Sequence, residues 1–299
     1  MEYACYNIFM SPAPYTVKTL ARGDFPPALL EIPQVPEKLF IAGELPDPSQ
    51  YYYLSVVGSR KYTNYGREAT ERIIAGLAGY PIVIVSGLAM GIDGIAHRAA
   101  LDAGLRTVAI PGSGLDPSII YPRAHLNLAR EILENGGALL SEYESDFRAT
   151  PWSFPERNRI MAGISQGVLV IEAEEKSGTL ITARLALDYN RTVFTVPGPI
   201  FSATSKGTNN LLRQGATPIT CAKDLLEELG FIEQQVGTLD LTLYTPEEQA
   251  ILILLDEPLA REDILSSLAT PPSQTLSILT VLEIKGVIQE RMGKIERVK

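Results

Sequence analysis

A buried strand, a glycine-spaced loop and an amphipathic helix follow one another directly in residues 81–105, PIVIVSGLAMGIDGIAHRAALDAGL. The β-branched run Ile82–Val85 lacks polar alternation, which is typical of a parallel strand covered on both faces. Apolar residues then recur at helical spacing from Ile92 to Ala103, and Gly104 ends the helix. Such a loop places backbone N–H groups at the carboxyl end of the strand, where an anion is readily bound.

The same alternation extends over the middle of the chain. Six β-branched runs, separated by helical stretches, begin at residues 54, 82, 107, 138, 168 and 192. Strands that alternate with helices in this way form a parallel sheet. We therefore predict an α/β domain with a mainly parallel sheet over residues 54–230.

Different patterns flank this domain. Residues 1–53 hold many prolines, which interrupt regular elements, and predict an extended lead-in that packs along the sheet domain. Residues 231–244 are polar and predict a linker. Residues 245–299 predict three short helices and a hairpin, which is the order of a small winged-helix domain.

Composition excludes several classes of protein. No apolar run approaches the roughly 18 residues of a membrane span, and the first residues lack a signal-peptide pattern, so we expect a cytoplasmic protein without a membrane partner. Cys5 and Cys221 are the only cysteines, which excludes a disulfide framework and a thiolate metal cluster. We predict no metal site and no cofactor.

The net charge of −9 is unevenly distributed. Basic and acidic residues number 3 and 6 in residues 1–53, 16 and 15 in residues 54–222, and 7 and 14 in residues 223–299. A general coat of basic charge is thereby excluded. A polyanion site at one edge of the near-neutral central domain remains possible.

The loops that follow the predicted strands share glycine, serine and basic residues. They are Gly58-Ser59-Arg60, Ser86-Gly87, Gly112-Ser113-Gly114, Glu142, the segment 174–179 with Lys176, Ser177 and Gly178, and Pro197-Gly198. All would gather at one edge of a parallel sheet, where ligands bind. The glycines could instead serve only tight turns, but their recurrence beside Ser, Arg and Lys favours an anion site.

The segment 152–165 adds two arginines and an aromatic ring. Arg157 and Arg159 flank Asn158, and Phe154 lies just upstream. Guanidinium groups bind phosphates and aromatic rings stack on bases, although a solvated loop is the alternative. Lys206, which precedes Gly207 at a helix start, is a further phosphate-binding candidate.

Familiar catalytic motifs are missing. The sequence has no GxxxxGK[ST] phosphate loop and no GxSxG elbow, and its two histidines, His97 and His125, cannot supply a His-rich metal site. Asp93 and His97 lie one helical turn apart and could form an acid–base pair, but bracing of the helix is the commoner role. We therefore predict no catalytic residue.

A series of motifs, taken together, resembles the DprA/Smf family (DNA-processing protein A). The motifs are VVGSR, SGLAMGIDGIAHRAAL, GSGLDPSIIYPRAH, SEY, FPERNRIMAGIS, VIEAEEKSGTLITA, VFTVPG and SKGTNNLLRQGA, and they span about Phe25 to Glu228. The resemblance implies an extended Rossmann-like domain, sequence-independent binding of single-stranded DNA, a homodimer, and loading of RecA recombinase in natural transformation and recombination. It implies no enzymatic activity.

Carried over by position, the resemblance implies a set of DNA-binding residues. They are Gly58, Ser59, Arg60, Ser86, Gly87, Arg157, Asn158, Arg159, Lys176, Ser177 and Gly178. Phosphates would then meet Arg60, Arg157 and Lys206 while bases stack on Phe154.

Two departures and one alternative accompany the resemblance. The helical N-terminal domain of many members is expected to be missing or reduced here. The third helix of the predicted winged helix has no arginine, which favours a protein-contact or regulatory role over DNA binding. The alternative function is a Rossmann-like nucleoside monophosphate hydrolase using Glu142 or Glu172, but EKSGTLITA replaces the PGGxGTxxE segment of such enzymes.

Overall fold

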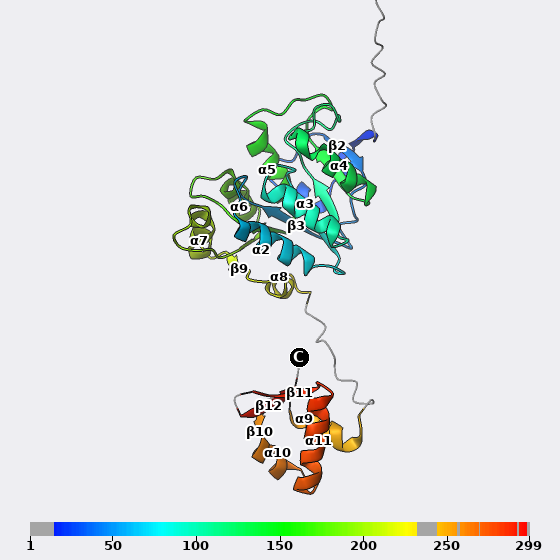
Figure 1. The fold of residues 1–299 in the computed structure, drawn as a ribbon. Coiled ribbons are helices and arrows are strands. Elements are labelled where there is room, and N and C mark those ends of the chain that lie inside the picture. Colours follow the sequence, from blue (N-terminus) through cyan, green and yellow to red (C-terminus); the bar gives the residue numbers. More distant parts are fainter. Residues whose placement is uncertain (1–14, 232–243, 256–257, 269, 292, 298–299) are drawn as a thin grey trace, which may run out of the picture. The chain divides into compact units, whose positions relative to one another are not determined.

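A nine-stranded sheet organises the larger part of the chain (Figure 1). The computed structural model describes residues 15–231, 244–255, 258–268, 270–291 and 293–297, which divide into two compact units on either side of the bond between Phe231 and Ile232. In spatial order the strands of the sheet are β1 (Val17–Leu20), β2 (Leu39–Gly43), β6 (Ala138–Ser141), β5 (Arg106–Ala109), β4 (Ile82–Ser86), β3 (Tyr52–Val57), β7 (Gly167–Val170), β8 (Thr192–Thr195) and β9 (Thr217–Pro218).

The six strands predicted from the sequence, β3 to β8, are present and parallel, which confirms the predicted fold class. Among these six strands, β3 comes first in the sequence, β4, β5 and β6 are added on one side of it, and β7 and β8 are added on the other side. The strand order therefore reverses between β3 and β7. In open parallel sheets, a ligand binds outside the carboxyl ends of the strands at such a point.

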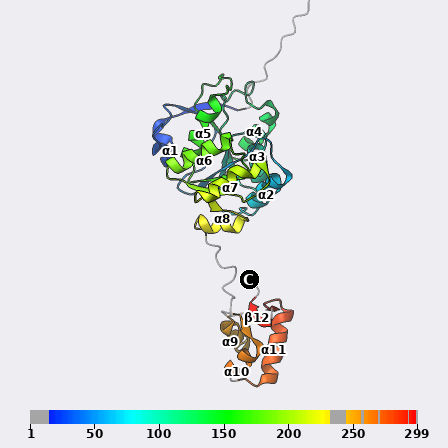
Figure 2. The same ribbon diagram turned by 90° about the vertical axis from the view of Figure 1, so that its left-hand side faces the viewer.

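Helices cover both faces of the sheet (Figure 2). One face carries α2 (Asn64–Ala75), α3 (Ile92–Asp102), α4 (Leu126–Glu134) and α8 (Ala222–Glu228), and the other carries α1 (Pro27–Leu30), α5 (Ser153–Ile164), α6 (Gly178–Asp188) and α7 (Lys206–Arg213). Short 3₁₀ helices are η1 (Arg22–Asp24), η2 (Arg123–His125) and η3 (Ala203–Ser205).

The residues of β4 show why its sequence is continuously apolar. Val83 and Val85 belong to the core beneath α5 and α6, while Ile82 and Ile84 belong to the core beneath α2 and α3. All four side chains are buried. Each such side chain stabilises the fold by about 1.5–3 kcal/mol relative to exposure, so a polar residue at any of them would be costly.

The N-terminal lead-in contributes more than the sequence predicted. Its strands β1 and β2 pair antiparallel with each other, and β2 pairs antiparallel with β6, so the segment extends the sheet itself. The prolines lie outside both strands, so every residue of the two strands has a backbone N–H group that can pair. The prediction of a lead-in without regular elements was therefore wrong for these strands. Residues 1–14, which include Cys5, lie outside the described residues.

The second unit has its own small core. Its elements are α9 (Pro246–Leu254), β10 (Leu259–Ala260), α10 (Arg261–Ser267), α11 (Pro272–Ile284), β11 (Ile288–Arg291) and β12 (Lys294–Arg297). Ile251, Ile264 and Leu279 of the three helices pack together with Ile295 of β12, in a sheet of order β10-β12-β11. The winged-helix assignment stays a prediction, and most of the predicted linker lies outside the described residues.

Among the helices in the described ranges, none combines the length and the apolar character needed to cross a bilayer.

Candidate functional site

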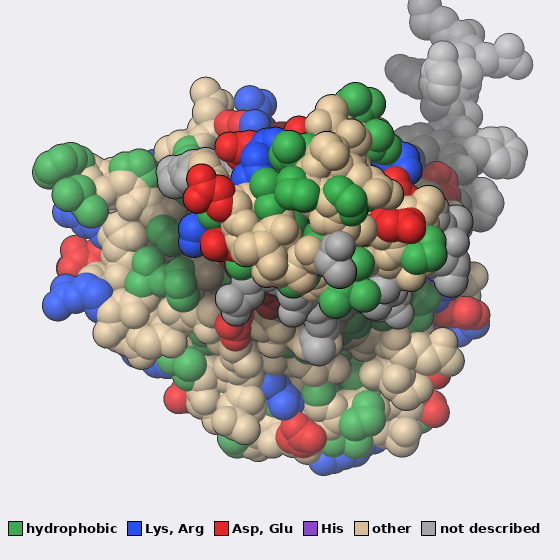
Figure 3. Space-filling view, turned by 90° about the horizontal axis from the view of Figure 1, so that it is seen from below, with side chains coloured by type: hydrophobic (Ala, Val, Ile, Leu, Met, Phe, Trp, Pro, Cys, Tyr) green, Lys and Arg blue, Asp and Glu red, His purple; other side chains and the backbone are tan. Residues whose placement is uncertain are grey.

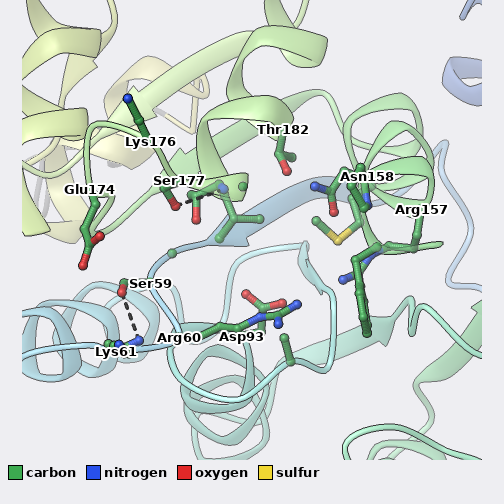
Figure 4. Close-up of a pocket in the computed structure, with 18 of the residues that line it drawn as sticks. Ser59, Arg60, Lys61, Asp93, Arg157, Asn158, Glu174, Lys176, Ser177 and Thr182 are labelled. Carbon is green, nitrogen blue, oxygen red and sulfur yellow. Dashed lines mark hydrogen bonds between the residues drawn. The ribbon is translucent and has the colours of Figure 1, made fainter. Parts of the chain in front are cut away.

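A cavity of about 620 Å³ lies where the strand order reverses (Figure 4). Its walls come from the loop after β3, the start of α3, the helix α5, and the loop and helix that follow β7. These segments are distant in sequence and meet because β3, β4 and β7 are neighbours in the sheet. The cavity therefore occupies the position at which this type of sheet binds ligands.

The loop after β3 brings two cations to the cavity. A Cβ atom on Gly58 would lie 2.6 Å from Cγ1 of Ile92, so only glycine lets the loop pass this close to α3. The Ser59 carbonyl accepts a hydrogen bond from the Ile92 N–H (3.2 Å), and the Ser59 hydroxyl accepts one from the Lys61 N–H (3.0 Å). These contacts fix the backbone while the side chains of Arg60 and Lys61 stay exposed.

The loop after β7 supplies the opposite wall. The Ser177 side chain accepts a hydrogen bond from the Thr179 N–H (3.2 Å) and caps α6, which begins at Gly178. Lys176 precedes this cap and is exposed. The positive end of the α6 dipole and a lysine thus border the same cavity, an arrangement that favours phosphate.

Phe154 provides a flat apolar surface at the cavity. The Arg60 guanidinium carbon lies 4.9 Å from the centroid of the Phe154 ring, within the range of a cation–π contact. A Cβ atom on Gly112 would lie 2.6 Å from Phe154 Cδ1, so this glycine leaves room for the ring. A half-buried ring beside an exposed guanidinium can stack a base next to a bound phosphate.

Arg157 does not have the exposed position that the sequence predicted. Its side chain is 3% exposed and donates a hydrogen bond to the Ile110 carbonyl. Burial lowers the pKa of Arg157 to about 10. The residue borders the cavity from within the protein, where it supports the wall, and direct contact of Arg157 with phosphates stays a prediction.

Arg159 points away from the cavity. Its Nη2 atom lies 2.6 and 2.7 Å from the two carboxylate oxygens of Glu142, and its Nη1 atom donates to the Gln34 carbonyl (2.9 Å). Both residues line a separate cavity of about 650 Å³ on the far side of Pro155. Of the predicted Arg157-Asn158-Arg159 segment, Asn158 is thus the member that presents a partly exposed side chain to the first cavity.

Three further predicted residues lie outside the cavity lining. Ser86 is buried and donates to the Val56 carbonyl (2.7 Å), while the Gly87 N–H donates to Asp93 Oδ2 (3.1 Å). A Cβ atom on Gly87 would overlap the Arg157 guanidinium. Ser86 and Gly87 therefore shape the wall behind the cavity. Lys206 begins α7 and is exposed, but it does not line the cavity either.

The acidic candidates for catalysis are held by structural contacts. Glu172 is buried and accepts hydrogen bonds from the Thr63 N–H (2.9 Å), the Thr63 hydroxyl (2.6 Å) and the Thr204 hydroxyl (3.1 Å). Glu142 is paired with Arg159. Neither carboxylate lines the first cavity, which argues against the hydrolase alternative.

Asp93 is the carboxylate on the cavity floor, beside Arg60 (Figure 4). Burial raises the pKa of Asp93, and the charges of Arg157 and Arg60 oppose that rise. No hydrogen bond in the described part of the chain joins it to His97, whose Nδ1 atom instead lies 2.7 Å from the Thr107 hydroxyl. The acid–base pair is therefore not formed.

Most of the exposed charged side chains at the cavity are basic. On the face shown in Figure 3, basic, acidic and hydrophobic side chains are interspersed. At the cavity, Arg60, Lys61 and Lys176 are exposed, against the carboxylates of Glu174 and Asp93. Three lining residues were not predicted from the sequence, Lys61, Met161 and Thr182. Lys61 directly follows Arg60, and Met161 and Thr182 follow Asn158 and Gly178 at helical spacings of three and four, so these positions could have identified them.

Comparison with known proteins agrees with this arrangement. The family model for DNA recombination-mediator protein A matches residues 16–230. Protein Smf of Escherichia coli (strain K12) is 38% identical over 284 residues, covering 92% of this chain and 75% of the relative. The chain belongs to the DNA recombination-mediator protein A family. The DprA/Smf resemblance seen in the motifs is thereby confirmed.

Other family members extend the comparison. DNA processing protein DprA of Streptococcus pneumoniae (strain ATCC BAA-255 / R6) is 42% identical over 207 residues, or 69% of this chain and 72% of that protein. The X-ray structure of DprA from Streptococcus pneumoniae superposes with a TM-score of 0.66 at 38% identity, covering 71% of this chain and 74% of that one. A structure of DNA processing protein A from Helicobacter pylori is described as giving insight into its unique single-stranded DNA binding mode. It superposes with a TM-score of 0.66 at 33% sequence identity, covering 73% of this chain and 98% of that one.

Proposed function

We propose that this chain is a recombination mediator that binds single-stranded DNA in the 620 Å³ cavity at the carboxyl ends of β3 and β7. The observation that carries the proposal is the cavity itself, which is lined by exposed Arg60, Lys61 and Lys176 and by the ring of Phe154, against which Arg60 lies. Phosphates and bases are the two repeating parts of a single strand, and this cavity offers a binding group for each.

The residues divide into two roles in this proposal. Arg60 and Lys176, with the amino end of α6, bind phosphates, while Phe154 stacks a base and Asn158 offers a polar contact. None of these contacts reads a base pair, so the binding is independent of sequence. Ser59, Ser177, Gly178 and the buried Arg157 hold the walls in place.

Membership of the family supports a wider role. We expect the chain to protect incoming or exposed single-stranded DNA in the cytoplasm, to act as a homodimer without a cofactor or catalytic activity, and to load RecA recombinase during natural transformation and recombination. Sedimentation will test the dimer. RecA ATPase activity on strands coated with single-stranded DNA-binding protein will test loading. If this chain loads RecA, ATP hydrolysis should begin sooner when the chain is added.

The C-terminal unit fits a protein-contact role better than a groove-binding one. Within α11, Leu276, Val281 and Ile284 are exposed, and Glu283 is its single charged residue. Helices that enter a DNA groove present basic and polar side chains to phosphates and base edges. A chain ending before Thr245 should therefore bind duplex DNA as weakly as the full chain, and a large loss on truncation would contradict this role.

The test of the main proposal compares labelled single-stranded and duplex oligonucleotides by fluorescence anisotropy over a series of salt concentrations. Single-stranded DNA should bind more tightly. Arg60→Ala should lower affinity and reduce the slope of log K against log salt by about 0.7 for one lost phosphate contact. The matched control is Arg72→Ala on α2, which removes the same charge from an exposed side chain outside the cavity.

Two outcomes would contradict the proposal. One is that neither oligonucleotide binds, and the other is that Arg60→Ala and Arg72→Ala behave alike. Release of free base from nucleoside monophosphates, lost in Glu142→Gln or Glu172→Gln, would favour the hydrolase alternative instead.

A further inference from the structure

An exposed tyrosine lies against the aromatic ring that borders the cavity. The centroid of the Tyr121 ring is 5.7 Å from that of Phe154, with the two planes inclined by 49°. Phe154 in turn lies beneath the Arg60 guanidinium. Arg60, Phe154 and Tyr121 thus form a continuous surface, which we call the Arg60–Phe154–Tyr121 surface, and it extends beyond the residues that line the cavity.

The fold holds Tyr121 outward without using its ring as core. The residue stands between buried Ile120 and buried Pro122, yet its own side chain is 51% exposed. Nearby backbone is fixed because the Ile120 N–H donates to the Asp116 carbonyl (3.2 Å) and the Arg123 side chain donates to the Pro117 carbonyl. Among the described residues, the Tyr121 hydroxyl has no hydrogen-bond partner. A large ring fixed at the surface loses little entropy when a ligand stacks on it.

A second exposed aromatic cluster lies near the start of α5, and its charge differs. Trp152 packs edge-on against Tyr143 (5.9 Å) and Phe147 (5.6 Å). The segment that carries these rings holds Glu142, Glu144 and Asp146 against Arg148, and the Tyr143 hydroxyl lies 3.4 Å from a carboxylate oxygen of Glu156.

Charge therefore favours one of the two aromatic clusters for a polyanion. Exposed Arg60 and Arg123 accompany Tyr121 against Asp116. Around Trp152, Glu142 and Glu144 are paired with Arg159 and Lys38, and the carboxylates of Asp146 and Glu156 stand against Arg148. A strand that leaves the cavity across Phe154 is attracted toward Tyr121 and repelled from Trp152.

We infer that single-stranded DNA leaves the cavity across Phe154 and stacks a second base on Tyr121. The inference rests on the proposed function, because it extends the same strand beyond the cavity. It gives the strand two neighbouring stacking positions and one direction of exit, and Trp152 lies off this path.

The test measures affinity against oligonucleotide length with the full chain. Oligo-dT from 2 to 12 nucleotides is titrated against the natural chain, Tyr121→Ala, Tyr121→Phe and Trp152→Ala. Tyr121→Ala should bind the shortest strands like the natural chain and the longer strands about tenfold more weakly, which is the effect of losing one stacked base. Tyr121→Phe keeps the ring and should restore affinity, and Trp152→Ala should match the natural chain at every length.

Trp152 also gives an independent readout because it is the single tryptophan of the chain. Saturating oligo-dT should leave its emission unchanged. The inference is overturned if Tyr121→Ala binds long strands normally, if Tyr121→Phe is as weak as Tyr121→Ala, or if Trp152 is strongly quenched and Trp152→Ala loses the affinity instead. If the natural chain binds no strand of any length, the proposed function fails before the exit path is at issue, so the two failures are distinct. Equal melting temperatures of the variants establish that all of them fold.

Discussion

Replacement of His97 should remove a pH-dependent part of the stability of the sheet unit. The Thr107 hydroxyl donates to the Ile84 carbonyl (2.7 Å), so it accepts from the His97 Nδ1–H, and Nε2 carries the free electron pair. Within the described residues, Nε2 is buried without a hydrogen-bond partner. A second proton there would be a buried, unpaired charge.

The pKa of His97 accordingly falls to about 3, chiefly through burial. The charges of His125 and Arg157 lower this pKa further. The Ser86 carbonyl raises it, but by less than burial lowers it. Because the folded value lies below the unfolded value of about 6.5, the neutral ring contributes its full stability above pH 6.5 and loses it as the pH falls toward 3. Between pH 7 and pH 5 the loss amounts to about 2 kcal/mol.

The assay is denaturant unfolding at pH 7 and pH 5, followed by the fluorescence of Trp152, which lies in the sheet unit. The natural chain should lose about 2 kcal/mol more than His97→Gln over this interval. Equal losses in the natural chain and His97→Gln would refute the reasoning.

Three further predictions concern neighbouring parts of the structure. Gly87→Ala should lower the free energy of unfolding by about 1–3 kcal/mol because its Cβ overlaps the Arg157 guanidinium, while Gly23→Ala, which meets nothing within 4 Å, should not; equal melting curves would contradict this. Arg159→Ala should lower the free energy of unfolding by about 1–3 kcal/mol, because it leaves Glu142 unpaired, and should keep the affinity for single-stranded DNA. Loss of affinity at unchanged stability would show instead that Arg159 binds DNA. Thr245→Ala should lose the cap of α9, worth about 1 kcal/mol, and speed hydrogen exchange of its first amides, whereas Thr245→Ser should not.

The sequence predicted the centre of the sheet well because the signal there is local. Continuous β-branched runs such as Ile82–Val85 require burial on both faces, and alternation with helices requires parallel strands. The lead-in was harder, since β1 and β2 are short and pair antiparallel with residues distant in sequence, β2 with β6. Prolines around them concealed two strands that contain none.

At the candidate site, too, local sequence predicted the position of the loops but not which side chains face the cavity. Glycine, serine and basic residues after β3 and β7 predicted where a ligand binds, because parallel strands end at one edge. The sequence could not distinguish Arg60, which is exposed, from Arg157, which is 3% exposed, or from Arg159, which is paired with Glu142. Which arginine faces the cavity depends on packing across α5 that no local pattern records.

Photo-crosslinking tests the central claim most directly. A single-stranded oligonucleotide that carries iodouracil is irradiated with the full chain, and the modified peptides are located by mass spectrometry. Binding of single-stranded DNA in the cavity predicts crosslinks at Phe154 and in the loops with Lys61 and Lys176, all reduced in Arg60→Ala. Crosslinks confined to α2, to the second cavity beside Arg159 or to the C-terminal unit would contradict it.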